Sequence, residues 1–82
     1  MIQVTGDVVV IHWIDCCIEE ATLSAKESRE VEPLECVTCG FLLAEDDASI
    51  TVATDHFDDN RYRHIQAFPK CQILSITRLK NP

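Results

Sequence analysis

Hydrophobic residues fall into five short runs separated by polar or charged segments. The first run, residues 8–14, opens with four consecutive β-branched side chains, which favour a strand over a helix. Four further runs have strand length and strand-like composition. They cover residues 34–44, 48–54, 62–68 and 72–79. The pattern therefore predicts five short strands.

The segment between the first two strands is long and polar. Ser24 and Glu27 have the spacing of a capping box, in which each side chain bonds the other residue's backbone amide. We expect a short helix over residues 25–30, and Pro33 ends this segment because proline forces the preceding residue into extended geometry. The first and second strands are thus joined by a surface excursion that contains one short helix.

The remaining connections are short. Gly40 inside the second strand indicates a bulge or sharp bend, and Pro69 introduces a single 3₁₀ turn before the last strand. Five strands, a long first connection and a one-turn break predict a mainly β fold with one short helix. We expect one domain over residues 1–82, a small, strongly bent SH3-like or Sm-like barrel with the helical excursion between strands one and two.

Alternation along the strands assigns inward and outward positions. In the third strand Ile50 and Val52 point inward, against Ser49 and Thr51 outward. In the second strand the larger apolar residues share one face and are assigned to the core. The expected core is Val9, Ile11, Trp13, Val37, Phe41, Leu43, Ile50, Val52, Ile65, Ile73, Leu74 and Ile76.

The charges are unevenly distributed along the chain. There are 14 acidic and 7 basic residues, a formal net charge of −7, and every acid lies within residues 7–59. The C-terminal part holds a candidate basic patch, Arg61, Arg63, Lys70, Arg78 and Lys80. These side chains either pack beside the acidic part of the same domain, or contact a neighbouring subunit, or bind a nucleotide or RNA through its phosphates.

The acidic residues form a second candidate surface. Its members are Glu19, Glu20, Glu27, Glu30, Glu32, Asp46 and Asp47. Such a surface suits an inhibitor or decoy that occupies the basic site of a host enzyme or defence complex.

Five cysteines are many for 82 residues, but their odd number and the adjacent Cys16 and Cys17 fit a disulfide framework poorly. With no secretory leader pattern at the N-terminus, we expect free thiols and a cytoplasmic location. Cys36 and Cys39 have the CxxC spacing of a zinc knuckle. A strand would point them to opposite faces, so we expect no structural zinc and no other cofactor.

No catalytic constellation stands out. His12 and Cys16 lack an orienting third group, and no apolar run approaches the ~20 residues of a membrane-spanning helix. The composition therefore favours a protein that is neither an enzyme nor embedded in a membrane.

Several motifs resemble a group of small proteins encoded by bacteriophages and prophages, whose function is poorly characterised. They are Thr-x-Gly-Phe-Leu at residues 38–42 with the acidic turn that follows, the β-branched strand at 50–53, Pro-Lys-x-x-Ile-x-x-Ile at 69–76, and Trp13-x-Asp15. The chain departs from the pattern at Cys39, where an aliphatic residue is expected. The last strand is also similar to the closing strand of Sm-like proteins, which are ring-forming RNA binders.

Together these features predict a non-enzymatic binding module. We expect a small cytoplasmic β-barrel of phage or prophage type that forms a homo-oligomer and acts through its surface. The alternatives are the acidic inhibitor or decoy, and an oligomer that binds or sequesters a nucleotide or RNA through its basic C-terminal strands.

Overall fold

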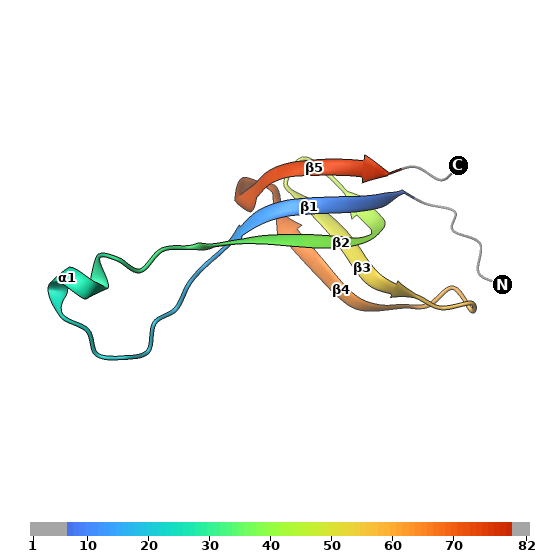
Figure 1. The fold of residues 1–82 in the computed structure, drawn as a ribbon. Helices are drawn as coiled ribbons and strands as arrows, with labels where there is room; N and C mark the ends of the chain where they lie inside the picture. The colour runs from blue at the N-terminus through green and yellow to red at the C-terminus, as the bar shows by residue number, and fades with distance from the viewer. Residues whose placement is uncertain (1–6, 80–82) are drawn as a thin grey trace.

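The computed structural model describes residues 7–79, and it contains five strands and one short α-helix (Figure 1). Each lies where the hydrophobic pattern predicts it, to within two residues at either end of every strand. The elements are β1 (Val8–Asp15), α1 (Ala25–Ser28), β2 (Leu34–Glu45), β3 (Ser49–His56), β4 (Tyr62–Pro69), the 3₁₀ turn η1 (Lys70–Gln72) and β5 (Ile73–Leu79).

The five strands form one antiparallel sheet in the order β4-β3-β2-β1-β5. β1 lies between β2 and β5, because Val8 faces Phe41 of β2 on one side and Leu79 of β5 on the other. The predicted mainly β fold with one short helix is thereby confirmed. β4 and β5 are the outer strands and do not pair with each other, so the sheet is open.

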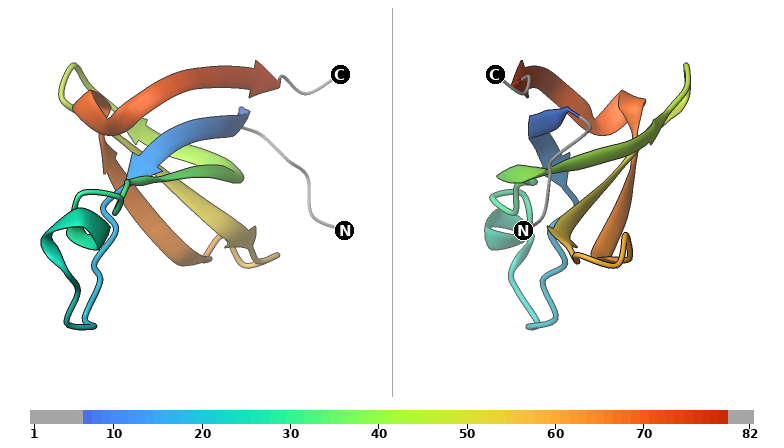
Figure 2. Two further views of the ribbon diagram at one scale, coloured as in Figure 1. Left: turned by 60° about the vertical axis from the view of Figure 1, so that its left-hand side comes forward. Right: turned by 90° about the vertical axis from the view of Figure 1, so that its right-hand side faces the viewer.

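The sheet is nevertheless strongly curled. In a flat sheet β4 and β5 would lie about 19 Å apart, given ~4.8 Å between neighbouring strands. The turn that joins them, η1, has three residues, and a 3₁₀ turn of that length spans only about 6 Å. The sheet must therefore bend until its two outer strands approach each other at this end, where η1 joins the end of β4 to the start of β5 (Figures 1 and 2).

The core fills the concave side of this curl. Ile50 and Val52 are fully buried, as the alternation of β3 predicts. They pack with residues of β1 and β4 that face the same side. The buried cluster is Val9, Ile11, Ile50, Val52 and Phe68, with Trp13, Leu42, Ile73 and Ile76 packed against it.

The assignment of the β2 faces is wrong. Val37 was expected in the core but is 68% exposed, and Phe41 and Leu43 are only half-buried. The inward face instead carries smaller residues. Thr38 accepts the indole N–H of Trp13 at 3.0 Å, and Gly40 lies where the β3 backbone approaches closely. Hydrophobicity alone selected the wrong face. Two other factors determine which residues of β2 point inward: the small room at Gly40 and the hydrogen bond between Thr38 and Trp13.

Two further core residues were assigned wrongly. Ile65 and Leu74, on the outer strands, are 59% and 49% exposed. Phe68, which the core prediction omitted, is buried and meets Trp13 edge-to-face with 5.0 Å between ring centroids. Such aromatic pairs add stability beyond the area they bury, so β4 is anchored by Phe68 rather than by Ile65.

The excursion between β1 and β2, residues 16–33, projects away from the sheet and is called the arm below (Figures 1 and 2). The predicted capping box is present: Ser24 Oγ accepts from the Glu27 amide at 3.1 Å, and Glu27 Oε1 accepts from the Ser24 amide. α1 ends two residues earlier than expected, and Arg29 and Glu30 form a turn. No residue of α1 is buried, so local capping rather than packing defines the helix.

Candidate functional site

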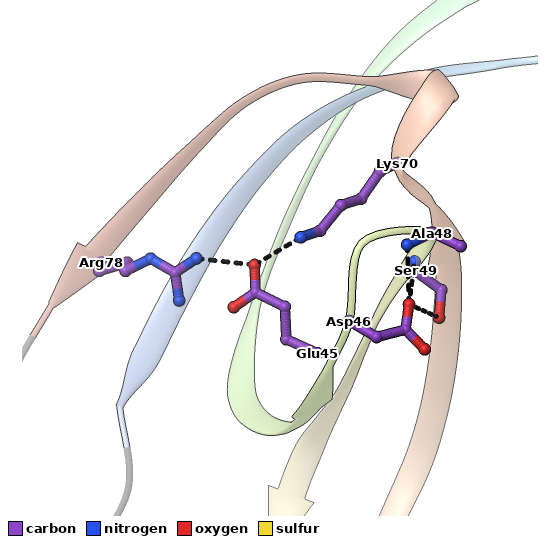
Figure 3. Close-up of polar contacts among 6 residues, drawn as sticks. All are labelled: Glu45, Asp46, Ala48, Ser49, Lys70 and Arg78. Atoms are coloured by element: carbon purple, nitrogen blue, oxygen red, sulfur yellow. Dashed lines mark hydrogen bonds and ion pairs between the residues drawn. The ribbon is translucent and has the colours of Figure 1, made fainter.

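Two of the predicted basic residues meet at one carboxylate. Glu45, at the end of β2, pairs with Lys70 of η1 at 2.9 Å and with Arg78 of β5 at 2.8 Å, both through the same oxygen (Figure 3). The Lys70 amide also donates to the carbonyl of Ala48 at 2.8 Å. This group links the end of β2 both to η1 and to the C-terminal end of β5.

The other two basic residues lie at the opposite end of β4. Arg61 pairs with Asp59 at 2.6 Å, and Arg63 pairs with Asp55 at 2.9 Å while its guanidinium lies over the ring of Phe57. The four described cations therefore form two separate clusters, and each cation contacts a carboxylate of the same chain. The fifth predicted member, Lys80, lies outside the described residues.

The cations perturb the carboxylate that they share. Hydrogen bonds from Arg78 and then Lys70 lower the pKa of Glu45 from 4.5 to about 2. The neighbouring Asp46 accepts the amides of Ala48 and Ser49 at 2.8 Å each, which lowers its pKa as well (Figure 3). Both carboxylates are thus held in the charged form by contacts that the unfolded chain lacks.

These shifts predict acid sensitivity. Because the folded-state pKa of Glu45 lies below its ordinary value, its contribution to stability is complete above pH 4.5 and is lost as the pH falls towards about 2. We expect the melting temperature to fall over this window, and Glu45→Gln to remove part of the fall. Thermal unfolding by circular dichroism between pH 2 and pH 6 measures both.

Glu30→Gln on the arm is the matched control, since the carboxylate of Glu30 makes no ion pair within residues 7–79. An equal effect of the two substitutions on the pH slope would show that the Glu45 contacts are not its cause.

The predicted acidic surface divides between two elements. Five of its members lie on the arm and make no ion pair with any described residue: Glu19, Glu20, Glu27, Glu30 and Glu32. Asp46 and Asp47 lie in the turn between β2 and β3. Glu45 and Asp55 of the sheet contact lysine or arginine side chains, whereas the five arm carboxylates have no such contact among the described residues.

Cys36 and Cys39 lie three residues apart on β2 and are not brought together. Cys36 faces Trp13 in the register with β1 and Cys39 faces Val10, so their side chains point to opposite sides of the sheet. Within residues 7–79, no three His, Cys, Asp or Glu side chains gather as a metal site would require.

The structure also contains a hollow of about 390 Å³ at the base of the arm, between the end of β1 and the start of β2. Its lining includes apolar residues, two acidic residues and two cysteines. The lining residues are Ile14, Asp15, Cys16, Cys17, Val31, Glu32, Pro33 and Gln72. The sequence analysis missed this hollow, because it depends on η1 packing beside both ends of the arm. The adjacent cysteines were the one feature that could have pointed to it.

The outer strands differ in how well they are protected against further pairing. β4 carries Arg63 and ends at Pro69, and His64 has a positive φ of 58° within the strand. Charges, proline and irregular backbone all discourage a neighbouring strand. β5 has no proline, glycine or positive φ, and its one charge, Arg78, is paired with Glu45.

Comparison of the chain with models of known protein families, with curated proteins and with solved structures finds no match. Among the helices of residues 7–79, none is long and apolar enough to cross a membrane. The arguments for function therefore rest on the chain's own residues.

Proposed function

We propose that this protein is a non-enzymatic binding module that self-associates by adding strands at β5. The strongly curled sheet, the strand order and the 3₁₀ turn between the last two strands support an SH3-like or Sm-like barrel as its fold. The resemblance to small phage- and prophage-encoded proteins is consistent with such a module, acting in the cytoplasm.

The observation that carries this proposal is the unprotected edge of β5. An outer strand presents a row of backbone N–H and C=O groups to any strand beside it, and natural proteins usually block such rows. The β5 residues Leu74 and Leu79 are about half exposed and place apolar surface along the same edge. A second strand laid against β5 would satisfy its backbone groups and cover these side chains.

A second copy of the chain is the partner that the geometry of β5 favours. Two β5 strands can pair antiparallel around a two-fold axis, the commonest symmetry of small oligomers. Arg78 would be repeated across such an interface, but its pairing with Glu45 reduces the repulsion between the two copies. In such a dimer only the β4 edges remain without a neighbouring strand. Because β4 discourages strand pairing, association stops at the dimer.

The test compares one substitution on each outer strand. Thr77→Lys places a charge on the exposed β5 edge, and Gln66→Lys places the same charge on the exposed β4 edge. We expect native mass spectrometry to show a dimer for the natural chain. Thr77→Lys should raise its dissociation constant at least tenfold, about 1.4 kcal/mol, and Gln66→Lys should leave it unchanged.

Two results would overturn the proposal. One is a natural chain that is monomeric at high micromolar concentration. The other is a dimer that Gln66→Lys disrupts and Thr77→Lys does not, which would move the interface to β4.

The arm favours a second candidate function, an inhibitor or decoy that binds a basic protein surface. Its five glutamates are exposed and make no ion pair within residues 7–79. The arm that carries them projects from the sheet, where a partner can reach it (Figure 1). Replacing Glu19, Glu20 and Glu27 by lysine would abolish such a complex and leave the β5 dimer intact. The nucleotide or RNA alternative has less support, because each described cation of the C-terminal part already contacts a carboxylate.

A further inference from the structure

The side of β5, β1 and β2 that faces away from the core is apolar. Val9 and Ile11 of β1 belong to the buried cluster, so alternation directs Val8 and Val10 to the opposite side of the sheet. Antiparallel sheets that bury one face normally carry polar residues on the other. Here the register instead joins outward residues of the three strands into two largely apolar rows, Leu79–Val8–Phe41 and Thr77–Val10–Cys39.

These two rows, together with the adjacent His12 and Val37, are called the outer patch below. Val37 is 68% exposed and Leu79 is 50% exposed, so the patch is open to solvent. It contains no Asp, Glu, Lys or Arg, although such residues make up 26% of the chain. Contiguous exposed apolar surface on a small protein marks an interaction site.

The surface changes from apolar to acidic towards the arm. At that end of the outer patch, His12 Nε2 lies 3.2 Å from a carboxylate oxygen of Glu35. The arm extends beyond the ends of β1 and β2 (Figure 1). Its five glutamates are exposed and make no ion pair within residues 7–79. A partner that covers both regions must therefore be apolar over the outer patch and basic over the arm.

The pairing of β1 selects the secondary structure of such a partner. β1 is paired with β2 on one side and with β5 on the other, so an occupant of this face must satisfy its own backbone groups. An α-helix does so internally, and its diameter of about 10–12 Å suits three strands spaced ~4.8 Å apart. The outward positions from Val8 to Ile14 span about 20 Å, which about 13 helical residues would cover.

We propose that the outer patch and the arm together dock an amphipathic helix of a partner protein, in which lysine or arginine residues follow the apolar stripe. The stripe covers the outer patch, and the basic residues meet the glutamates of the arm. The proposal rests on the second candidate function, in which the arm binds a basic surface, and adds the form of that partner and its apolar contact. It is separate from the β5 dimer, which uses the backbone edge of β5 rather than the face of the sheet.

A fluorescently labelled synthetic helix serves as the probe, and its anisotropy measures binding to the full-length chain. Its first 13 or so residues carry leucines at i, i+3, i+4 and i+7 spacing, and about five lysines follow. We expect saturable binding. A peptide of the same composition with leucines at alternating positions should bind at least tenfold more weakly, and replacing the lysines by glutamate should abolish binding.

Substitutions in the chain place the helix on the sheet. Val37→Gln should raise the dissociation constant at least fivefold, and Cys39→Gln is the second variant should Val37→Gln fail to fold, as circular dichroism checks. Ile65→Gln is the matched control, because Ile65 is similarly exposed at 59% but lies on β4, which β3 separates from β2. It should leave binding unchanged. Glu19→Gln combined with Glu20→Gln should weaken binding at least threefold and reduce its dependence on salt.

Three results would overturn the proposal. One is equal binding of the helical and alternating peptides, and another is a loss caused by the arm substitutions but not by Val37→Gln. Either would leave the arm as a simple acidic site, so the second candidate function would survive. The third is an oligomer of the chain that Val37→Gln dissociates, which would assign the outer patch to a second copy. Because β1 separates β2 from β5, Val37→Gln does not alter the β5 edge, and the β5 dimer is tested independently.

Discussion

Phe68→Ala is expected to remove most of the free energy of unfolding. Phe68 is 2% exposed and packs in the cluster that joins β1, β3 and β4. Truncating a buried phenylalanine costs about 3–5 kcal/mol, and a domain of this size has a total stability near the lower end of about 5–15 kcal/mol. The substitution also removes the edge-to-face contact with Trp13. Denaturant unfolding followed by Trp13 fluorescence measures the loss.

Phe57→Ala is the control for this prediction. It makes the same chemical change at a ring that is 37% exposed and lies under the guanidinium of Arg63. We expect a loss of no more than about 1 kcal/mol, the value of an exposed cation–π contact. Comparable losses for the two substitutions would mean that the core is not centred on Phe68.

Enlarging Gly40 is expected to produce the second-largest loss. A Cβ atom at this position would lie 2.7 Å from the carbonyl oxygen of Ala53, and this neighbour is backbone rather than a flexible side chain. Overpacking of this kind costs about 1–3 kcal/mol for a small addition. Glycine-to-alanine replacement recovers only about 0.4–1 kcal/mol through the unfolded chain. Gly40→Ala should therefore destabilise, and Gly40→Val should destabilise more.

Cys39→Val tests the same strand on its other face. Cys39 is exposed and adjacent to Gly40, so added bulk there meets solvent rather than β3. We expect little change in melting temperature for Cys39→Val. Gly40→Ala should lower it by roughly 4–8 °C per kcal/mol lost. A Gly40→Ala variant as stable as the natural chain would show that β2 and β3 can separate without cost.

The hydrophobic pattern predicted the strands well because each run is bounded by charged or turn-forming residues. The polar turn after β2 and the proline before β5 define element ends without reference to the rest of the chain. The capping box likewise depends on two residues three apart, and its hydrogen bonds are both present. Local chemistry was sufficient for these features.

The same pattern failed to assign the faces of β2. Both faces of that strand carry apolar residues, so alternation could not distinguish them. The choice depends on contacts with residues distant in the sequence, namely the close approach of the Ala53 carbonyl to Gly40 and the hydrogen bond from the Trp13 indole to Thr38. Packing between residues so far apart in the sequence cannot be predicted from the local pattern of one segment.

The candidate sites also combine features that the sequence predicted with contacts that depend on the fold. The excess of basic residues after position 59 was visible in the sequence, and their packing beside acidic residues of the same chain was one of the interpretations offered. Which carboxylate each cation contacts depends on the curl of the sheet, which brings Lys70 and Arg78 to Glu45. The hollow at the base of the arm depends on the same curl and could not be predicted from spacing.

The position of β1 between β2 and β5 has a consequence for synthesis. Translation delivers β1 first among the strands, but one of its two neighbours is the last strand of the sheet, as the partnership of Val8 with Leu79 shows. While the chain is still on the ribosome, β1 can pair with β2 only and keeps one edge open. Folds dominated by such distant pairings form slowly. The nascent chain thus exposes an apolar strand edge until β5 emerges, which is the interval in which a chaperone would act.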